Sequence, residues 1–458
     1  MYRLKNFVGA LALALLVPAA ALAQVDTGAA NFTRYVAIGD SLTAGYMSGS
    51  LFETAQRSSY PALIYRQATG QTAGFEQPLV SDPGLPNGAF ELRSLVPVVI
   101  APKSGQGGPI NLTVPRPYNN LAVPGARLRD TLVTFTGGLH DLVLRPSAFQ
   151  NTTALQQAML YNPTFVTIWI GNNDVLAAAT SGIVIDGVTL TTAVQFETDF
   201  RTLVSTLASA QASPRMAMAT IPDVTVIPFV NALSRFVPNP ATGQPVLVNG
   251  QPVPLIGPNG QLVAGDRVLL SASSLLAQGI GVPAALGGRG TPLPDTAVLS
   301  VSEVATISAR VQAYNNVIRA VANERNAALI DTNALLIRAA QGQIGVGGIA
   351  FTPAFLTGGI FSYDGVHPTA IGYALIANEF IAAINDKYDA GIPPVNLFPF
   401  VFGTSAATSA FAASTDLASE MPAFLFTEEA RKSLFKGLRI DENPKKPRGK
   451  GGKKGGRK

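Results

Sequence analysis

The sequence of 458 residues contains no cysteine and only two histidines, His140 and His367. Without cysteine there can be no disulfide, no thiol nucleophile and no lipid-modified cysteine. Two histidines leave a zinc site few ligands to draw on. We expect no cofactor. Charged residues are also scarce, at 13% against 47% hydrophobic residues. The chain can therefore bury a large core, in one long domain or two.

Negative charges outnumber positive ones outside the two ends of the chain, although the formal net charge is +5. Residues 445–458 carry eight positive charges and no negative ones, and Arg3 and Lys5 add two more. Setting these aside leaves a net charge of −5 for the rest. The body of the protein is therefore mildly acidic.

The end of the chain, residues 441–458, is expected to be a disordered basic tail, because glycine and lysine cannot bury a core. No aromatic residue is interleaved with the lysines of 445–458 for base stacking, so we expect no specific nucleic-acid partner. Two interpretations stay open. The tail is solvated without a partner, or it makes a weak electrostatic contact with a polyanion or an acidic membrane surface.

Long hydrophobic runs are confined to the N-terminus. Arg3 and Lys5 precede a 16-residue run, 8–23, which ends in Ala-Leu-Ala before Gln24. This pattern predicts a signal peptide over residues 1–23 that is cleaved after Ala23. An uncleaved anchor is the alternative, although the run is short for a membrane span. We expect a secreted or periplasmic protein, and export without disulfides is typical of a bacterial one.

Short apolar runs alternate with segments of helical periodicity along most of the chain. Nearly continuous apolar strands separated by helices predict an α/β fold with a central parallel sheet covered on both faces. The expected strands are 35–38, 118–123, 165–170, 216–221 and 327–330, and the expected helices are 61–67, 152–160, 196–207, a long helix that starts at a Ser300–Glu303 capping box, and one after Pro368.

Proline and glycine interrupt this alternation twice, at about 70–117 and 228–298. We expect both to be insertions into one domain, 24–390. The first should hold a β-hairpin of strands 96–101 and 110–114, and the second should form a cap or lid of short hairpins. The C-terminal extension, 391–440, is expected to pack along the body.

Ser41 comes directly after the strand 35–38, in the sequence Gly-Asp-Ser-Leu. Open α/β sheets place their active sites at the carboxyl ends of strands, so Ser41 is a candidate nucleophile. The plainer alternative is a serine that caps a helix.

A serine nucleophile needs a base, and histidine is the usual one. His367 lies in the sequence Asp-Gly-Val-His-Pro before a helix, and Asp364 could turn back to accept a hydrogen bond from its ring. His140 is the other candidate, but no strand end places it near Ser41, and we expect it to be a surface or loop histidine.

Acyl transfer also needs hydrogen-bond donors for the oxyanion. The candidates are the N–H groups of Ser41 and Gly125 and the side-chain amide of Asn173, and both of the latter follow predicted strands. Each of these two alone is equally well explained as part of a tight turn. Four separate strand-end or loop segments that supply one mechanism favour the catalytic interpretation.

The four segments resemble the conserved blocks of the SGNH hydrolases, also called the GDSL-like lipase/acylhydrolase family. They are Gly39-Asp-Ser-Leu42, Asn120-Leu-Ala-Val-Pro-Gly125, Gly171-Asn-Asn-Asp174 and Asp364-Gly-Val-His367, in the order of that family.

The resemblance implies a flavodoxin-like three-layer α/β/α sandwich without a metal. It also implies Ser41 as nucleophile, His367 as base and Asp364 as its orienting group, with an oxyanion hole from Ser41, Gly125 and Asn173. The Gly-x-Ser-x-Gly elbow of the α/β-hydrolases is missing around Ser41, which argues against that fold.

The expected function is that of an exported serine ester hydrolase that cleaves carboxylic esters through an acyl-enzyme on Ser41. Its substrate would be a small-molecule, lipid or O-acyl (such as O-acetyl) glycan ester, with specificity set by the insertions. A non-catalytic surface or glycan-binding protein that keeps the fold is the alternative.

Overall fold

The computed structural model describes residues 25–95, 97–240, 242–402 and 424–445. The predicted signal peptide lies outside the described residues, as does the basic tail from residue 446 onward. Within the described ranges, no helix combines the length and the apolar character that crossing a membrane requires.

The core is a parallel sheet with the strand order β1-β4-β5-β12. Its strands are β1 (Tyr35–Gly39), β4 (Phe165–Trp169), β5 (Arg215–Ala219) and β12 (Ala328–Ile330). Every residue of β1 and β4 is buried, as their continuous apolar sequence predicts for strands covered on both faces. The predicted α/β class with a central parallel sheet is confirmed.

The predicted strand 118–123 is only a bridge to the sheet. The N–H of Ala37 donates to the carbonyl of Asn119 at 2.8 Å, and the N–H of Leu121 donates to the carbonyl of Ala37 at 2.9 Å. Residues 119–121 therefore run parallel to β1 through one bridge, after which the chain turns at Pro124-Gly125.

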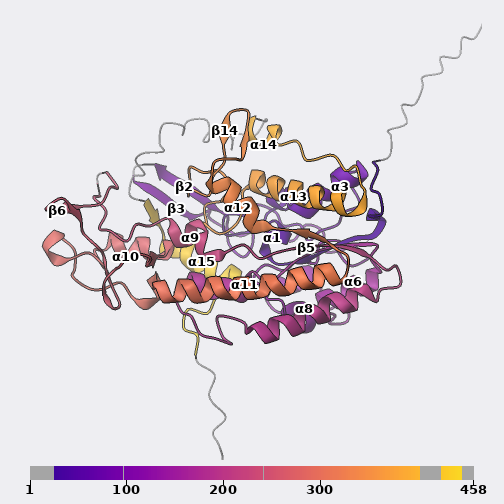
Figure 1. Ribbon diagram of the computed structural model, residues 1–458, viewed down its shortest axis with the longest axis horizontal. Coiled ribbons are helices and arrows are strands. Elements are labelled where there is room, and N and C mark those ends of the chain that lie inside the picture. Colours follow the sequence, from indigo (N-terminus) through magenta and orange to yellow (C-terminus); the bar gives the residue numbers. More distant parts are fainter. Residues whose placement is uncertain (1–24, 96, 241, 403–423, 446–458) are drawn as a thin grey trace, which may run out of the picture.

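Helices cover the sheet on both sides, which makes three layers (Figure 1). On one side, α3 (Tyr60–Thr69) and α13 (Ala370–Tyr388) pack on the face that carries Tyr35 and Ala37. On the other side, α8 (Ala193–Ala208) and α11 (Val301–Glu324) pack on the face that carries Val36 and Ile38. Alternate residues of β1 thus enter different clusters, as the two-residue period of a strand requires.

The five predicted helices all exist, with ends that differ by a few residues. The capping box at the start of α11 is also confirmed, because the Ser300 N–H donates to Glu303 at 2.8 Å and the Glu303 N–H donates to Ser300 Oγ at 3.4 Å. The predicted helix 152–160 is α6 (Ala154–Tyr161). Further helices of the described residues are α1 (Ser41–Ala44), α2 (Glu53–Gln56), α4 (Asp130–Val133), α5 (Leu139–Leu144), α7 (Asn173–Ser181), α9 (Pro228–Asn231), α10 (Ser273–Ala277), α12 (Thr332–Ala340), α14 (Phe398–Phe402) and α15 (Glu428–Leu438).

The first insertion holds a hairpin, but the predicted pairing of 96–101 with 110–114 is wrong. Its strands are β2 (Phe90–Leu95) and β3 (Val98–Pro102), which are antiparallel. Phe90 and Ile100 are buried and supply the apolar face of this pair. The glycine-rich stretch 104–108 is not the turn. It runs back along 81–84, where Ser81 and Gly107 donate their N–H groups across the two segments.

The second insertion forms a projection at one end of the molecule, near the labels β6 and α10 in Figure 1. It consists of short paired strands around a small cluster of its own, which includes Val237, Leu255 and Leu293. The strands are β6 (Leu247–Val248), β7 (Gln251–Pro252), β8 (Ile256–Gly257), β9 (Gly260–Gln261), β10 (Arg267–Val268) and β11 (Val298–Leu299). A further short pair, β13 (Gly345–Val346) and β14 (Ile349–Ala350), lies before the loop of His367.

The C-terminal extension returns to the body. Its strand β15 (Phe424–Phe426) pairs in parallel with β3, so the sheet of the first insertion has three strands. The helix α15 follows, and its buried residues Leu434, Phe435 and Leu438 belong to the main core cluster. The predicted limits of the domain and of the extension stay predictions.

Asn315 of α11 ties the helix to the end of β5. Its amide accepts from the N–H of Ile221 at 2.7 Å and donates to the carbonyl of Ile221 at 2.8 Å. Asn315→Ala leaves the buried N–H of Ile221 without this acceptor, and we expect the free energy of unfolding to fall by about 1–3 kcal/mol. Urea unfolding measures it. Gln312→Ala, at an exposed position of the same helix, is the control, and an equal effect of the two would contradict the prediction.

Candidate active site

Ser41 is held in the turn that leads from β1 into α1. Asp40 is the N-cap of α1, and its Oδ1 accepts a hydrogen bond from the N–H of Leu42 at 3.0 Å. Gly45 ends the helix in a left-handed conformation, with φ at 80°, and its position close to α2 leaves no room for a side chain. Ser41 therefore sits at the carboxyl edge of the sheet, as its place after β1 predicts.

The structure brings Ser41, His367 and Asp364 into one chain of hydrogen bonds. Ser41 Oγ lies 2.8 Å from His367 Nε2, and His367 Nδ1 lies 2.8 Å from Asp364 Oδ2. If Asp364 is ionised it can only accept, so Nδ1 carries the proton and Nε2 presents its lone pair to the serine hydroxyl. In this arrangement the imidazole can remove the proton of Ser41.

Asp364 is buried and surrounded by donors. Its Oδ1 accepts from the N–H groups of Val366 and His367 at 2.9 and 2.8 Å, and its Oδ2 accepts from the N–H of Gly49 at 2.7 Å. Burial by itself raises the pKa of this carboxyl, but the charge of His367 and the hydrogen bonds from its ring and from the N–H groups of His367 and Val366 outweigh burial, and the pKa is lowered. Asp364 therefore stays ionised and orients the imidazole.

The loop of His367 is fixed by contacts that the sequence motif does not contain. Ser362 Oγ donates to Asp364 Oδ1 at 3.2 Å, and it also accepts from the N–H of Ser48 at 2.8 Å. The Tyr46 ring lies 4.7 Å from the imidazole of His367, between ring centres. Sequence reasoning missed Tyr46, Ser48 and Ser362. Tyr46 and Ser48 follow the Ser41 block closely, but nothing in the sequence says that they return to the histidine loop.

The two other predicted oxyanion donors lie next to each other. Gly125 has φ at 78°. Asn173 Nδ2 donates to the carbonyl of Ala126, the residue after Gly125, at 2.9 Å. One amide hydrogen of Asn173 is used in this way, and the other remains for a ligand. The Ser41 N–H is the first of α1, and such N–H groups have no partner within their helix.

Asparagines join the three strand-end segments. Asn172 Nδ2 donates to Asp40 Oδ2 at 2.8 Å, and Asn120 Nδ2 donates to the carbonyl of Thr43 at 2.9 Å. The segments of Gly125 and Asn173 are thus both connected to the segment of Ser41. The structure places every predicted site residue in this one region.

Two buried carboxyl groups beside the site, those of Asp40 and Asp174, have raised pKa values. Burial raises the pKa of Asp40 to about 6, although its hydrogen bond from Asn172 acts in the opposite direction. Burial also raises the pKa of Asp174 to about 6, against hydrogen bonds from Thr191 and from the Leu128 N–H. Both residues belong to motif blocks that the sequence shows, but the sequence does not show that their carboxyl groups are buried.

The expectation for His140 was wrong, because it is a buried residue of α5 and not a surface or loop residue. It is 1% exposed, and its Nδ1 lies 3.2 Å from the carbonyl of Gly137. Its Nε2 has no hydrogen-bond partner among the described residues. His140 is a core histidine that does not hydrogen-bond to Ser41.

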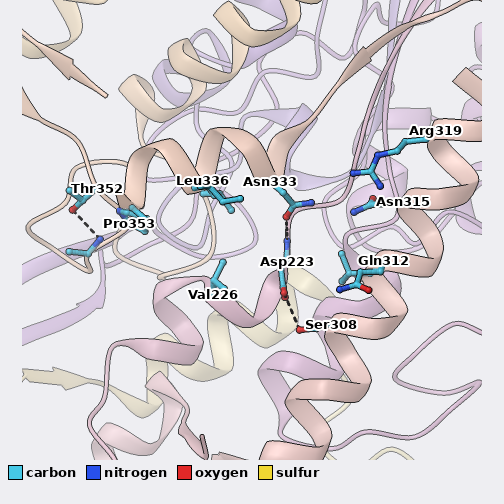
Figure 2. Close-up of a pocket in the computed structure, with 14 residues that line it drawn as sticks. Asp223, Val226, Ser308, Gln312, Asn315, Arg319, Asn333, Leu336, Thr352 and Pro353 are labelled. Carbon is cyan, nitrogen blue, oxygen red and sulfur yellow. Dashed lines mark hydrogen bonds between the residues drawn. The ribbon is translucent and has the colours of Figure 1, made fainter. Parts of the chain in front are cut away.

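A cavity of about 680 Å³ lies further along the same edge of the sheet, beyond β5 and β12. Figure 2 shows it between α11, α12 and the loop at Thr352, with Asp223 bonded to Ser308 and Asn333. Its lining does not include Ser41, Asp364 or His367. Among the described residues, no three histidine, aspartate or glutamate side chains form a group that could hold a metal ion.

The family model described as GDSL-like Lipase/Acylhydrolase matches residues 35–380 of the sequence, which include all four motif blocks. The chain belongs to this family. It is therefore an ester-hydrolysing enzyme, as the resemblance of its motifs predicts. No curated protein sequence gives a significant match to the chain.

Solved structures of several hydrolases are distantly similar to this GDSL-like protein. Axe2, an acetylxylan esterase from Geobacillus stearothermophilus, has 14% identity over 76% of this chain and 93% of its own, with a TM-score of 0.34. LAE5, an alpha/beta hydrolase from the metagenome of Lake Arreo, has 16% identity over 77% and 94%, also with 0.34. A putative GDSL-like lipase from Parabacteroides merdae has 15% over 58% and 72%, with 0.29. These likenesses are too low to carry an argument about substrate.

The raised pKa of Asp40 predicts a pH dependence of stability. Its ordinary pKa is 3.8 and its pKa in the folded chain is about 6, so the folded chain binds this proton more tightly. The corresponding stability is present below about pH 4 and is lost as the pH rises through about 6. Asp40→Asn should remove this loss, which is on the order of 3 kcal/mol. Asn172 can turn its unpaired Oδ1 toward the new amide.

Urea unfolding at pH 4, 5, 6 and 7 tests this expectation. Asp386→Asn, at an exposed position of α13, is the matched control and should keep the wild-type slope. An Asp40→Asn protein with the same slope as the wild type would contradict the assignment.

Proposed function

We propose that this enzyme is an exported carboxylic ester hydrolase that acts through an acyl-enzyme on Ser41. The observation that carries the proposal is the buried hydrogen-bond chain from Ser41 through His367 to Asp364, with both contacts at 2.8 Å. This chain is complete and correctly ordered for general-base activation of a hydroxyl. It argues against the alternative of a non-catalytic binding protein.

Acylation begins when Ser41 Oγ attacks the carbonyl carbon of the ester and its proton passes to His367 Nε2. The carbonyl oxygen becomes an oxyanion, which accepts hydrogen bonds from the N–H groups of Ser41 and Gly125 and from Asn173 Nδ2. As the carbon–oxygen bond to the alcohol breaks, Nε2 gives its proton to the leaving oxygen. Asp364 stabilises the imidazolium between these two steps.

Deacylation repeats the steps with water. His367 takes a proton from the water, whose oxygen adds to the acyl carbon. The second tetrahedral intermediate collapses to the free acid, and Nε2 returns the proton to Ser41 Oγ. The residues of the site thus return to their starting protonation states.

The proposed substrates are esters of lipids or of O-acylated glycans. The proposed location, outside the cell or in the periplasm, rests on the basic and apolar pattern of residues 1–23. The eight positive charges of 445–458 support a weak contact with an acidic surface in the same compartment.

Replacing Ser41 tests the mechanism directly. Ser41→Ala should lower the hydrolysis of p-nitrophenyl acetate by about 10³-fold or more, because no other group in the site supplies the attacking oxygen. Labelling by a fluorophosphonate probe should disappear together with activity, while the circular dichroism spectrum stays that of the wild type. Ser302→Ala, at an exposed serine, is the control. Full activity of the Ser41→Ala protein would overturn the proposal.

Asn173 is expected to act mainly in the transition state. Asn173→Ala should reduce kcat by about 10²- to 10³-fold with little change in KM, because the oxyanion forms only as the reaction proceeds. Steady-state kinetics separate the two constants. Labelling of Ser41 should remain detectable but slow. An unchanged kcat with a raised KM would instead assign Asn173 to substrate binding.

A further inference from the structure

The end of helix α15 lies directly against the oxyanion side of the site. A methyl group added at Gly125 would be 3.0 Å from the carbonyl oxygen of Gly437 and 3.0 Å from the carbonyl carbon of Leu438. Such a distance is that of tightly packed atoms. The side of Gly125 that has no side chain is thus occupied by the backbone of the C-terminal extension.

The same turn of α15 lies against the histidine side of the site. A methyl group at Gly437 would overlap the hydroxyl of Tyr46. Tyr46 is fully buried, its hydroxyl donates to the carbonyl of Gly49 at 2.5 Å, and its ring contacts His367. Gly437 therefore connects Gly125 on one side with the ring that packs on the catalytic base on the other.

Several contacts fix α15 in this position. Ser433 Oγ accepts from Asn87 Nδ2 of the first insertion at 2.9 Å, and Arg439 pairs with Asp130 at 3.4 Å. The strand that leads into the helix is held by Ser273 of the second insertion, whose Oγ donates to the carbonyl of Phe426 at 3.0 Å. Both insertions therefore hold the helix against the site.

Access to the nucleophile is narrow in this arrangement. Ser41 is 2% exposed and His367 is fully buried. An ester has to bring its carbonyl carbon within about 3–3.5 Å of Ser41 Oγ to react. Atoms that surround Ser41 so closely restrict how large an ester can do so.

We propose that the end of α15, at Gly437 and Leu438, is a wall of the active site that selects small esters by limiting the space over Ser41. The inference rests on the proposed function, since it concerns which esters reach the same serine. Of the proposed substrates, it favours glycans with short acyl groups over esters of long-chain lipids. It makes Gly437 a specificity-determining residue, although it lies beyond the part of the chain that the family model matches.

Gly437→Ala is the decisive variant. Alanine favours a helix more than glycine does by about 1 kcal/mol, so the substitution does not weaken α15 itself. Its methyl group has to push the helix end away from Tyr46, which widens the site. We expect the ratio of kcat/KM for p-nitrophenyl octanoate to that for p-nitrophenyl acetate to rise at least about fivefold. Lys436→Ala, at the exposed neighbouring position, should keep the wild-type ratio.

A double variant separates the contact from general damage. Tyr46→Phe removes the hydroxyl that the new methyl overlaps, so adding Gly437→Ala to Tyr46→Phe should change the ratio much less than adding it to the wild type. A ratio in Gly437→Ala that falls or stays within about twofold of the wild type would overturn the inference. An equal increase in kcat/KM for both esters would also overturn it, because the helix would then limit access to Ser41 without selecting between esters by size.

The experiment also distinguishes this inference from the proposed function. A wild-type protein that hydrolyses p-nitrophenyl acetate and is labelled at Ser41 supports the proposed function, whatever the ratio does in Gly437→Ala. A wild-type protein that does neither contradicts the proposed function itself. Melting temperatures of all variants show whether each is folded at the assay temperature.

Discussion

The buried negative charge of Asp364 is the constraint on which the rest of the site depends. A carboxylate without water is costly unless donors surround it, and here they come from two distant parts of the chain. Gly49 supplies its N–H from the segment after Ser41, while Val366 and His367 supply theirs from the loop before α13. The donors that stabilise the charge thus also bring the histidine to the serine.

The parallel sheet supplies the platform for this arrangement. The carboxyl ends of β1 and β4 lie side by side, so the residues that follow them share one edge. Beyond the ends of the strands, where the backbone hydrogen bonds of the sheet stop, side-chain amides join the neighbouring segments. Asn172 bonds to Asp40, and Asn120 bonds to Thr43, across the gaps between the segments. Asn120 and Asn172, to which the sequence assigns no role, therefore link the segments that follow neighbouring strands.

Much of the fold could be predicted because its signals are local. Continuous apolar runs mark β1 and β4, and the Ser300–Glu303 capping box marks the start of α11 within a few residues of sequence. The site residues could also be predicted from the sequence, since each follows a strand or precedes a helix. The two histidines and the absence of cysteine left few candidates for a base and a nucleophile.

The predictions that the structure contradicts concern contacts between residues that are distant in the sequence. The pairing of β3 with β2, and with β15 from the other end of the chain, has no local signal, since strand propensity does not choose a partner. The burial of His140 under surrounding elements is likewise a tertiary property. Gly437 lies in an ordinary amphipathic helix, and only the folded chain shows that it touches Tyr46.

The parallel pairing of β15 with β3 has a consequence for the order of folding. Residues 424–426 and 98–100 are separated by more than 300 positions, so their contact closes a very long loop and forms late in a chain that is made from the N-terminus. The serine, the histidine and the sheet beneath them all precede β15 in the sequence. A nascent chain therefore has its catalytic groups before the end of helix α15 can pack against Gly125 and Tyr46.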